Sequence, residues 1–167
     1  MNAKSGILMG LMILISTSGY AQNSDIESLR GLTGIYVLVE NLQSEIIADG
    51  LNEEQIQTDV ELKLRLAGIK VLTREEFLKE SGHPHLYIIV NSIKNKTGLY
   101  SYSIIVSLDQ SIYLQRNPEI DIFGATTWRS KYNISTVGEF YIDTSVRDAI
   151  KDRIDIFIND YLSVNPR

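Results

Sequence analysis

The sequence predicts an α+β fold, a two-layer sandwich in which two main helices cover one face of a mixed sheet of about five strands. Three observations predict this class. Two apolar runs of strand length enclose an amphipathic helical segment, in the order of a β-α-β unit. The middle of the chain then alternates apolar and polar residues, as an antiparallel meander does when only one of its faces is buried. A second amphipathic segment closes the chain.

The first half of the chain supplies the β-α-β unit. Residues 34–42 form a β-rich apolar run and predict a strand. Residues 52–67 predict a helix, because Asn52 and Gln55 can form a capping box and Gly68 can end the helix. Residues 69–72 predict a short strand parallel to the first, and residues 73–77 predict another capped helical turn.

The helix at residues 52–67 is expected to bury a broad face. Two ion pairs at a spacing of four residues, Asp59 with Lys63 and Glu61 with Arg65, are expected on the rest of its surface. Its core stripe is predicted to consist of Ile56, Val60, Leu64 and Ala67, with Leu62 and Leu66 widening it.

The second half supplies the meander and the closing helix. We expect a strand at residues 86–93, a turn at 94–98, a long alternating segment, a turn at 117–118, and a return strand at 120–128 or on to residue 136. One face of the alternating segment carries Tyr100, Tyr102, Ile104, Val106, Leu108, Ile112 and Leu114. The closing helix, at residues 144–162, has a stripe of Val146, Ile150, Ile154, Phe157 and Tyr161.

Residues 1–21 are predicted to be a secretory signal peptide. Lys4 provides a positive start, residues 7–15 form a short apolar core, and the small residues Gly19 and Ala21 precede the expected cleavage point. A membrane-spanning helix would need about 20 apolar residues. We therefore expect cleavage, with no stable membrane anchor afterwards, and export to the periplasm or the extracellular space. The alternative is an N-terminal core helix.

The chain contains no cysteine. Attachment of a lipid to a cysteine behind the leader is therefore excluded, and the exported protein must be stabilised by its core without disulfides. The remaining length suits one core. We expect residues 22–33 to be a flexible lead-in and residues 34–167 to form a single α+β domain.

The net charge argues against polyanionic partners. The chain has a formal net charge of −5 and an isoelectric point of about 5.0. A nucleic-acid-binding domain would carry a cluster of lysine and arginine on one face. Here bases and acids are interspersed, so neither nucleic acid nor anionic lipid is an expected partner.

No residue is assigned a catalytic, cofactor-binding or metal-binding role, because the chain contains none of the common nucleophile, phosphate-loop or metalloprotease motifs. His83 and His85 are the only histidines and are interpreted as a turn that enters a strand, with a metal site or a catalytic base as the alternative. Two groups of acids offer weaker cation hypotheses. The first is Asp148, Asp152 and Asp155, which we interpret as a solvated helix face shared with Arg147, Lys151 and Arg153. The second is Asp109, Glu119 and Asp121, a weak calcium hypothesis.

Aromatic residues gather on the predicted meander strands. Cross-strand packing explains most of them. The functional alternative is an interaction surface that includes Tyr113, Trp128 and Arg129, because aromatic and arginine side chains are common at the centres of protein interfaces.

Residues 61–72, ELKLRLAGIKVL, form a helix that ends at Ala-Gly and turns directly into a strand. This segment resembles the start of small bacterial envelope domains of the TolB N-terminal, Lpo-type and curli-secretion kinds. Residues 86–93 and 155–162 are similar to segments of uncharacterised secreted bacterial proteins. The resemblance implies a β-α-β unit, a meander and a closing helix. Its lipoprotein members carry a lipidated cysteine that this chain lacks.

The leading hypothesis is a non-enzymatic exported binding or adaptor domain that recognises an envelope or extracellular protein through the open sheet face or a sheet edge. The alternative is a domain that binds a small ligand or a carbohydrate. The third hypothesis is an unrecognised hydrolase that uses His83 or His85. A sheet edge can also pair across a two-fold axis, so a homodimer is a further alternative.

Overall fold

The computed structural model describes residues 24–166, and the predicted signal peptide at residues 1–21 lies outside the described residues. The elements follow in the order β1 (Tyr36–Val39), α2 (Ser44–Ala48), α3 (Glu53–Leu66), α4 (Arg74–Phe77), β2 (His85–Lys94), β3 (Leu99–Leu114), β4 (Asn117–Arg129), β5 (Ile134–Gly138), the 3₁₀ turn η1 (Glu139–Tyr141) and α5 (Ile142–Val164).

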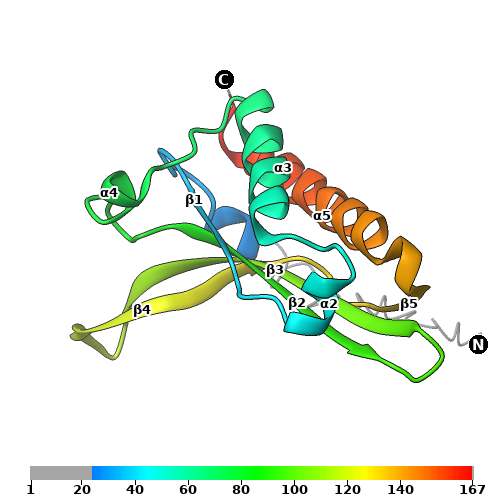
Figure 1. Ribbon diagram of the computed structural model, residues 1–167. Coiled ribbons are helices and arrows are strands. Elements are labelled where there is room, and N and C mark those ends of the chain that lie inside the picture. The colour runs from blue at the N-terminus through cyan, green and yellow to red at the C-terminus, as the bar shows by residue number, and fades with distance from the viewer. Residues whose placement is uncertain (1–23, 167) are drawn as a thin grey trace, which may run out of the picture.

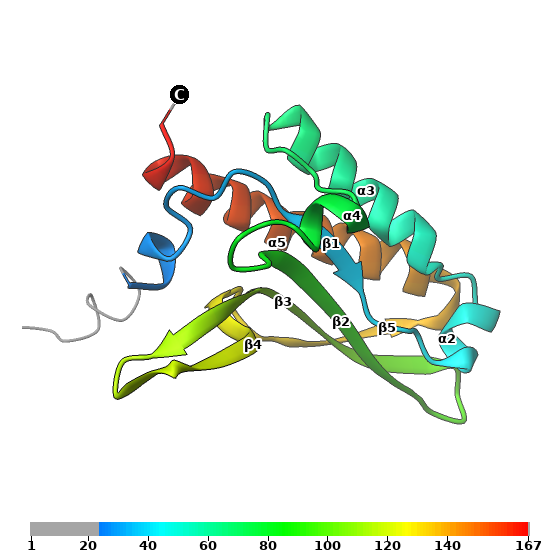
Figure 2. The same ribbon diagram turned by 90° about the vertical axis from the view of Figure 1, so that its left-hand side faces the viewer.

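The fold is α+β, as predicted. The five strands form one mixed sheet in the order β1-β2-β3-β4, with β5 also paired to β3. Strands β1 and β2 are parallel and the other pairs are antiparallel. The long helices α3 and α5 both lie over one face of the curved sheet, and no helix within residues 24–166 covers the opposite face (Figures 1 and 2).

Strand β3 is the centre of the sheet and changes partner along its length. On one side it pairs with β2 over residues 100–109. On its other side it pairs with β5 over residues 99–103 and with β4 over residues 107–114. Residues 130–133, which connect β4 to β5, cross the edge of β3 where the partner changes, and Ser130 donates its N–H to the carbonyl of Val106 at 2.9 Å. Beyond Asp109, where the pairing with β2 ends, β3 and β4 continue as a two-stranded arm (Figure 2).

Helix α3 forms where the sequence predicts it. The Asn52 side chain accepts hydrogen bonds from the N–H groups of Glu54 and Gln55, at 2.8 and 3.2 Å, and so caps the helix. The predicted stripe residues Ile56, Val60 and Leu64 are buried, and Ala67 packs against the core. Leu62 and Leu66 were expected to widen this face, but they are 53% and 78% exposed. The helix therefore buries only a narrow stripe.

Ion pairs bind α3 to α5. The predicted pair of Glu61 with Arg65 is present at 2.7 Å. The other predicted pair is not formed, because Asp59 bonds Arg147 of α5 at 2.9 Å and Lys63 bonds Asp155 of α5 at 2.7 Å. Ion pairs between α3 and α5 thus form in place of the predicted ion pair within α3.

Helix α5 closes the core, as predicted. It begins at Ile142, earlier than expected, and its buried residues include Val146, Ile150, Ile154 and Phe157. Tyr161 is partly buried and donates its hydroxyl to the carbonyl of Leu32 at 2.9 Å.

Three local predictions differ from the structure, and one helix was not predicted. Residues 69–72 form only an isolated parallel bridge, between Val71 and Ile35, and the parallel neighbour of β1 is β2. The short helix α2 was not expected. The turn between β3 and β4 lies at residues 115–116 and not at 117–118. The return strand is interrupted at residues 130–133, where the chain passes from β4 to β5.

Residues 24–33, expected to be a flexible lead-in, are attached to the core. Residues 24–27 form a helical turn and Leu29 is fully buried. The Gly31 N–H donates to the Asn165 side chain at 2.7 Å, and Asn165 in turn donates to the carbonyl of Leu29 at 2.9 Å. Burial of Leu29 and these bonds to the end of α5 hold the segment in place. Between residues 24 and 166, no helix is both long and apolar enough to cross a membrane.

A polar network fastens the loop around α2 to the sheet. Lys94 of β2 bonds the carboxylates of Asp49 and Glu139, both at 2.7 Å, and the buried Tyr100 hydroxyl donates to Asp49 at 2.6 Å. The bond from Lys94, together with that from Tyr100, holds the pKa of Asp49 below its ordinary value. Burial and the bond to Asp49 raise the pKa of Tyr100 to about 12.

Candidate binding groove on the uncovered sheet face

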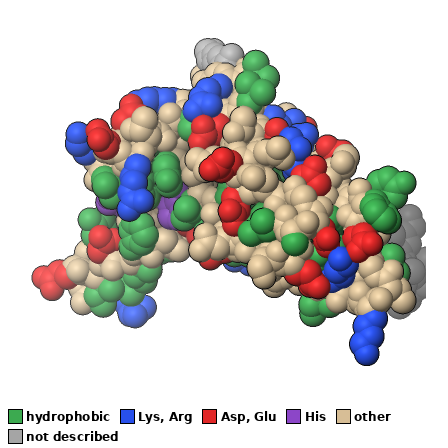
Figure 3. Space-filling model, in the orientation of Figure 1, with side chains coloured by type: hydrophobic (Ala, Val, Ile, Leu, Met, Phe, Trp, Pro, Cys, Tyr) green, Lys and Arg blue, Asp and Glu red, His purple; other side chains and the backbone are tan. Residues whose placement is uncertain are grey.

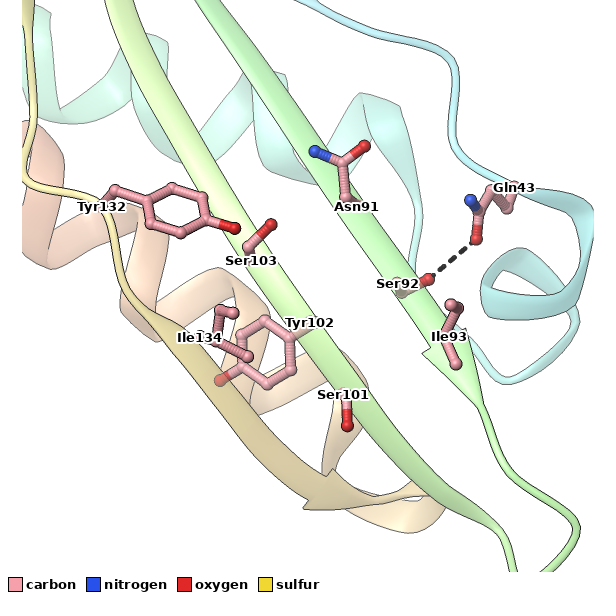
Figure 4. A pocket seen from close by; sticks show the side chains of 9 residues that line it. All are labelled: Gln43, Asn91, Ser92, Ile93, Ser101, Tyr102, Ser103, Tyr132 and Ile134. Atoms are coloured by element: carbon pink, nitrogen blue, oxygen red, sulfur yellow. Dashed lines mark hydrogen bonds between the residues drawn. The ribbon is translucent and has the colours of Figure 1, made fainter.

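A groove of about 350 Å³ lies where β2, β3 and β5 run side by side (Figure 4). Its floor is set by the register of the three strands. Asn91 faces Ser103 across β2 and β3, and Ser103 faces Ile134 across β3 and β5. Two residues further along, Ile93 faces Ser101. Since side chains alternate along a strand, these five project from the same face.

The groove combines a polar floor with apolar walls. Serine hydroxyls and the Asn91 amide can donate and accept hydrogen bonds. Ile93, Ile134 and Tyr132 stand around them and are 73%, 68% and 62% exposed. Tyr132 reaches from the β4–β5 connection towards β3 beside Ser103 (Figure 4). Three large exposed apolar side chains around one depression are typical of a surface that a ligand or partner covers.

The groove itself is neutral, but the adjacent chain is basic. The side chains that line the groove carry no formal charge: Gln43, Asn91, Ser92, Ile93, Ser101, Tyr102, Ser103, Tyr132 and Ile134. Residues 122–138, which include the β4–β5 connection, contain the exposed bases Arg129 and Lys131 and no acid. In a chain with net charge −5, this segment has the opposite sign to the whole.

The three residues of the predicted interaction surface do not form one surface. Trp128 faces the helices and is 3% exposed; its indole N–H donates to Asp160 at 2.9 Å, and its ring packs edge-on against Phe157. Arg129 is exposed next to it. Tyr113, 68% exposed, lies on the arm. The register pairs Trp128 with the buried Leu108, so its side chain enters the core and is closed to a partner.

The two histidines lie where the arm meets the body of the protein, among apolar side chains (Figure 3). His85 is 6% exposed, and its Nδ1 lies 3.0 Å from the carbonyl oxygen of His83, so Nδ1 carries the proton. His83 has a positive φ of 44°, and its Nδ1 lies 3.3 Å from the Ser111 hydroxyl. Phe77 and Phe123 pack against both imidazoles.

A second cavity, of about 360 Å³, adjoins His83 and is also lined by Ser111, Tyr113 and Asp121. It contains a histidine and a hydroxyl, the side-chain types of a base and a nucleophile, at a long hydrogen-bond distance. The N–H groups of His83 and Ser111 are already bonded to the carbonyls of Glu80 and Gly82, so neither can stabilise an oxyanion here.

Neither group of acids named from the sequence forms a cation site within residues 24–166. Asp148 bonds Lys151 at 3.4 Å and Asp155 bonds Lys63 at 2.7 Å, as on an ion-paired helix face. Asp109 is 8% exposed and pairs with Thr126 across the strands, whereas Asp121 pairs with Tyr113 further out on the arm. Within residues 24–166, no three His, Cys, Asp or Glu side chains are grouped so as to hold a metal ion.

Arg153 differs from its expected place on the solvated face of α5, because it is buried and only 7% exposed. It lies three residues after Ile150 and four before Phe157, so the helical period itself places it on the buried stripe. Its guanidinium donates from Nη1 to the carbonyl of Ala149 at 2.6 Å and from Nη2 to the side-chain oxygen of Asn133.

No known protein-family model matches this chain, and no curated protein matches it.

Proposed function

We propose that this protein is an exported, non-enzymatic binding domain that holds an extended segment of an envelope or extracellular polypeptide in the groove between β2, β3 and β5. The observation that carries the proposal is the placing of Ile93, Tyr132 and Ile134. They are exposed together around a hydroxyl and amide floor, on the sheet face that no helix of the described residues covers. The predicted signal peptide at residues 1–21, together with the resemblance of residues 61–72 to small bacterial envelope domains, favours an exported setting.

Two further features favour a polypeptide as the occupant. Strand β5 lies at the edge of the sheet beside the groove, and an edge strand offers backbone hydrogen bonds to an added strand. The basic β4–β5 connection, with Arg129 and Lys131, favours a segment that carries acidic groups.

A saccharide is the second candidate, favoured by a single observation. The ring of Tyr132 is 62% exposed beside Asn91 and Ser103, and an open aromatic ring with amide and hydroxyl neighbours suits a sugar ring. If this alternative holds, envelope glycans will raise the thermal midpoint of the wild type and leave Tyr132→Ala unchanged.

The test is affinity capture of the tagged, exported protein from its own cells after brief crosslinking, with quantification of each captured protein. The wild type is compared with Tyr132→Ala and with Ile134→Ser. Because both side chains are more than 60% exposed, neither change should affect folding by more than about 0.5 kcal/mol. We expect one envelope protein to be captured by the wild type and reduced at least tenfold in both variants.

Tyr113→Ala is the matched control. Tyr113 is 68% exposed, as open as Tyr132, but lies on the arm away from the groove. If Tyr113→Ala abolishes capture and Tyr132→Ala leaves it intact, the partner binds on the arm and the groove proposal is refuted.

A further inference from the structure

The buried guanidinium of Arg153 lies behind the groove. Its bond to Asn133 fixes it at the β4–β5 connection, between Tyr132 and Ile134, which both line the groove. Tyr102, a third groove residue, lies near enough to act on the charge of Arg153. Residues 104–106 of β3 pair with neither β5 nor β4 on this side. Among the described residues, only the β4–β5 connection covers this part of the sheet edge.

This charge has no acidic hydrogen-bond partner among the described residues, although the neighbouring Asp152 lies near enough to act on it. Among residues 24–166, Arg153 forms no ion pair, whereas the partly buried Arg147 bonds both Asp59 and Asp143. The Arg153 Nε–H is buried and has no hydrogen-bond partner. A buried charge is costly unless it is paired, and Arg153 is held only by two neutral oxygens. The Ser130 hydroxyl, three residues before Asn133, is also buried and unbonded within the described chain.

Asn133 covers the guanidinium as a surface residue. It is exposed, although its side-chain oxygen reaches inwards to Nη2. One edge of the guanidinium carries two parallel N–H groups, on Nη2 and on Nε. Asn133 accepts the bond from Nη2, and the Nε–H beside it is not bonded within the described chain. A carboxylate has two oxygens at the spacing that matches these two N–H groups, whereas an amide has one.

We propose that Arg153 is a carboxylate-recognition site: an acidic group of the bound polypeptide displaces the Asn133 side chain and bonds Nε and Nη2 of Arg153 together. The inference rests on the proposed function at one point, that the carboxylate belongs to a bound polypeptide. Arg129 and Lys131 on the same connection attract the anion, and Arg153 binds it.

The first experiment uses acetate as the probe and needs no partner. The Nε–Hε signals of ¹⁵N-labelled protein are followed by NMR during titration with sodium acetate, against sodium chloride of equal ionic strength. Arg153→Met identifies the signal, and it should fold because an apolar chain of similar length replaces a buried charge. We expect the Arg153 signal to move saturably while that of the exposed Arg129 does not.

Two changes at Asn133 sharpen the test. Asn133→Asp supplies a carboxylate within the chain, so we expect it to raise the thermal midpoint by about 2–4 °C and to abolish the acetate response. Asn133→Ala uncovers the guanidinium, so half-saturation should need less acetate than in the wild type. Three results would each overturn the proposal. They are a thermal midpoint of Asn133→Asp no higher than that of the wild type, acetate shifts at Arg129 equal to those at Arg153, and a stronger response of the Arg153 signal to inorganic phosphate than to acetate.

Failure of this inference is distinguishable from failure of the proposed function. An acetate response at Arg153 with no partner dependent on Tyr132 would leave the carboxylate site standing and remove the polypeptide groove. A partner that depends on Tyr132 but is captured equally by Arg153→Met would keep the groove and remove the carboxylate site.

Discussion

Replacement of Trp128 by alanine tests whether this side chain is buried in the core and therefore closed to a partner. Trp128 is 3% exposed, packs with a ring-centroid distance of 5.0 Å against Phe157, and donates to Asp160. Removing a buried indole costs about 3–5 kcal/mol of unfolding free energy. Trp128→Phe keeps an aromatic ring but loses the hydrogen bond to a carboxylate and leaves some space, so we expect about 1–3 kcal/mol.

The assay is urea denaturation followed by far-ultraviolet circular dichroism, because the chain has one tryptophan and the variants lose it. Tyr113→Ala, on the exposed arm, should stay within about 0.5 kcal/mol of the wild type. The reasoning is refuted if Trp128→Ala costs less than about 1 kcal/mol, because an indole so easily lost would be a surface residue and available to a partner.

The remaining predictions concern the helix pair and two titrations. Leu66→Glu and Leu62→Glu should each change the unfolding free energy by no more than about 0.5 kcal/mol, while Leu64→Ala should lower it by about 2–5 kcal/mol; equal losses would contradict the narrow stripe of α3. The Arg147 bond holds the pKa of Asp59 below its ordinary value of 3.8, so the stability from this pair is present above pH 3.8 and is lost as the pH falls through the lower folded pKa. The thermal midpoint of Asp59→Asn should therefore fall less steeply on acidification than that of the wild type, and parallel curves would count against the pair. Burial and the Asp49 bond raise the pKa of Tyr100 from 10.0 to about 12, so its contribution is complete below pH 10 and is lost between pH 10 and 12. The difference in midpoint between wild type and Tyr100→Phe should shrink over that interval, and a constant difference would contradict the assignment.

Local signals in the sequence were sufficient for α3, α4 and α5, but not for the short helix α2. The stripes of α3 and α5 follow the helical period, and Asn52 and Thr73 cap helices as their positions indicate. Along β3 the even-numbered residues from Tyr100 to Leu108 are all buried, as the alternation predicts, but Ser103 and Ser107 on the other face are buried as well. The alternation fails further on, because irregular pairing after Leu108 and after Gln110 interrupts it.

The groove could not be predicted from local signals, because it depends on register between distant strands. Asn91, Ser103 and Ile134 come together only because β2 and β5 flank β3 with these particular partners. Nothing near Trp128 in the sequence distinguishes the two faces of β4, so its burial is equally a matter of pairing with Leu108.

Arg153 is the instructive exception. Its spacing from Ile150 and Phe157 places it on the buried stripe, but its charge and its neighbours Lys151 and Asp152 are typical of a solvated face. For a single buried arginine, helical period was the better guide than charge pattern.

Site-specific photocrosslinking tests the central claim, that the uncovered face is where a partner binds. A photoreactive amino acid is placed at Ile93 or Ile134 in the groove, and as controls at Leu62 or Leu66 on the outer side of α3, all of which are more than half exposed. The protein is irradiated in its own cells. The account predicts a discrete crosslinked species from the groove positions alone. Crosslinks from α3 and none from the groove would contradict it.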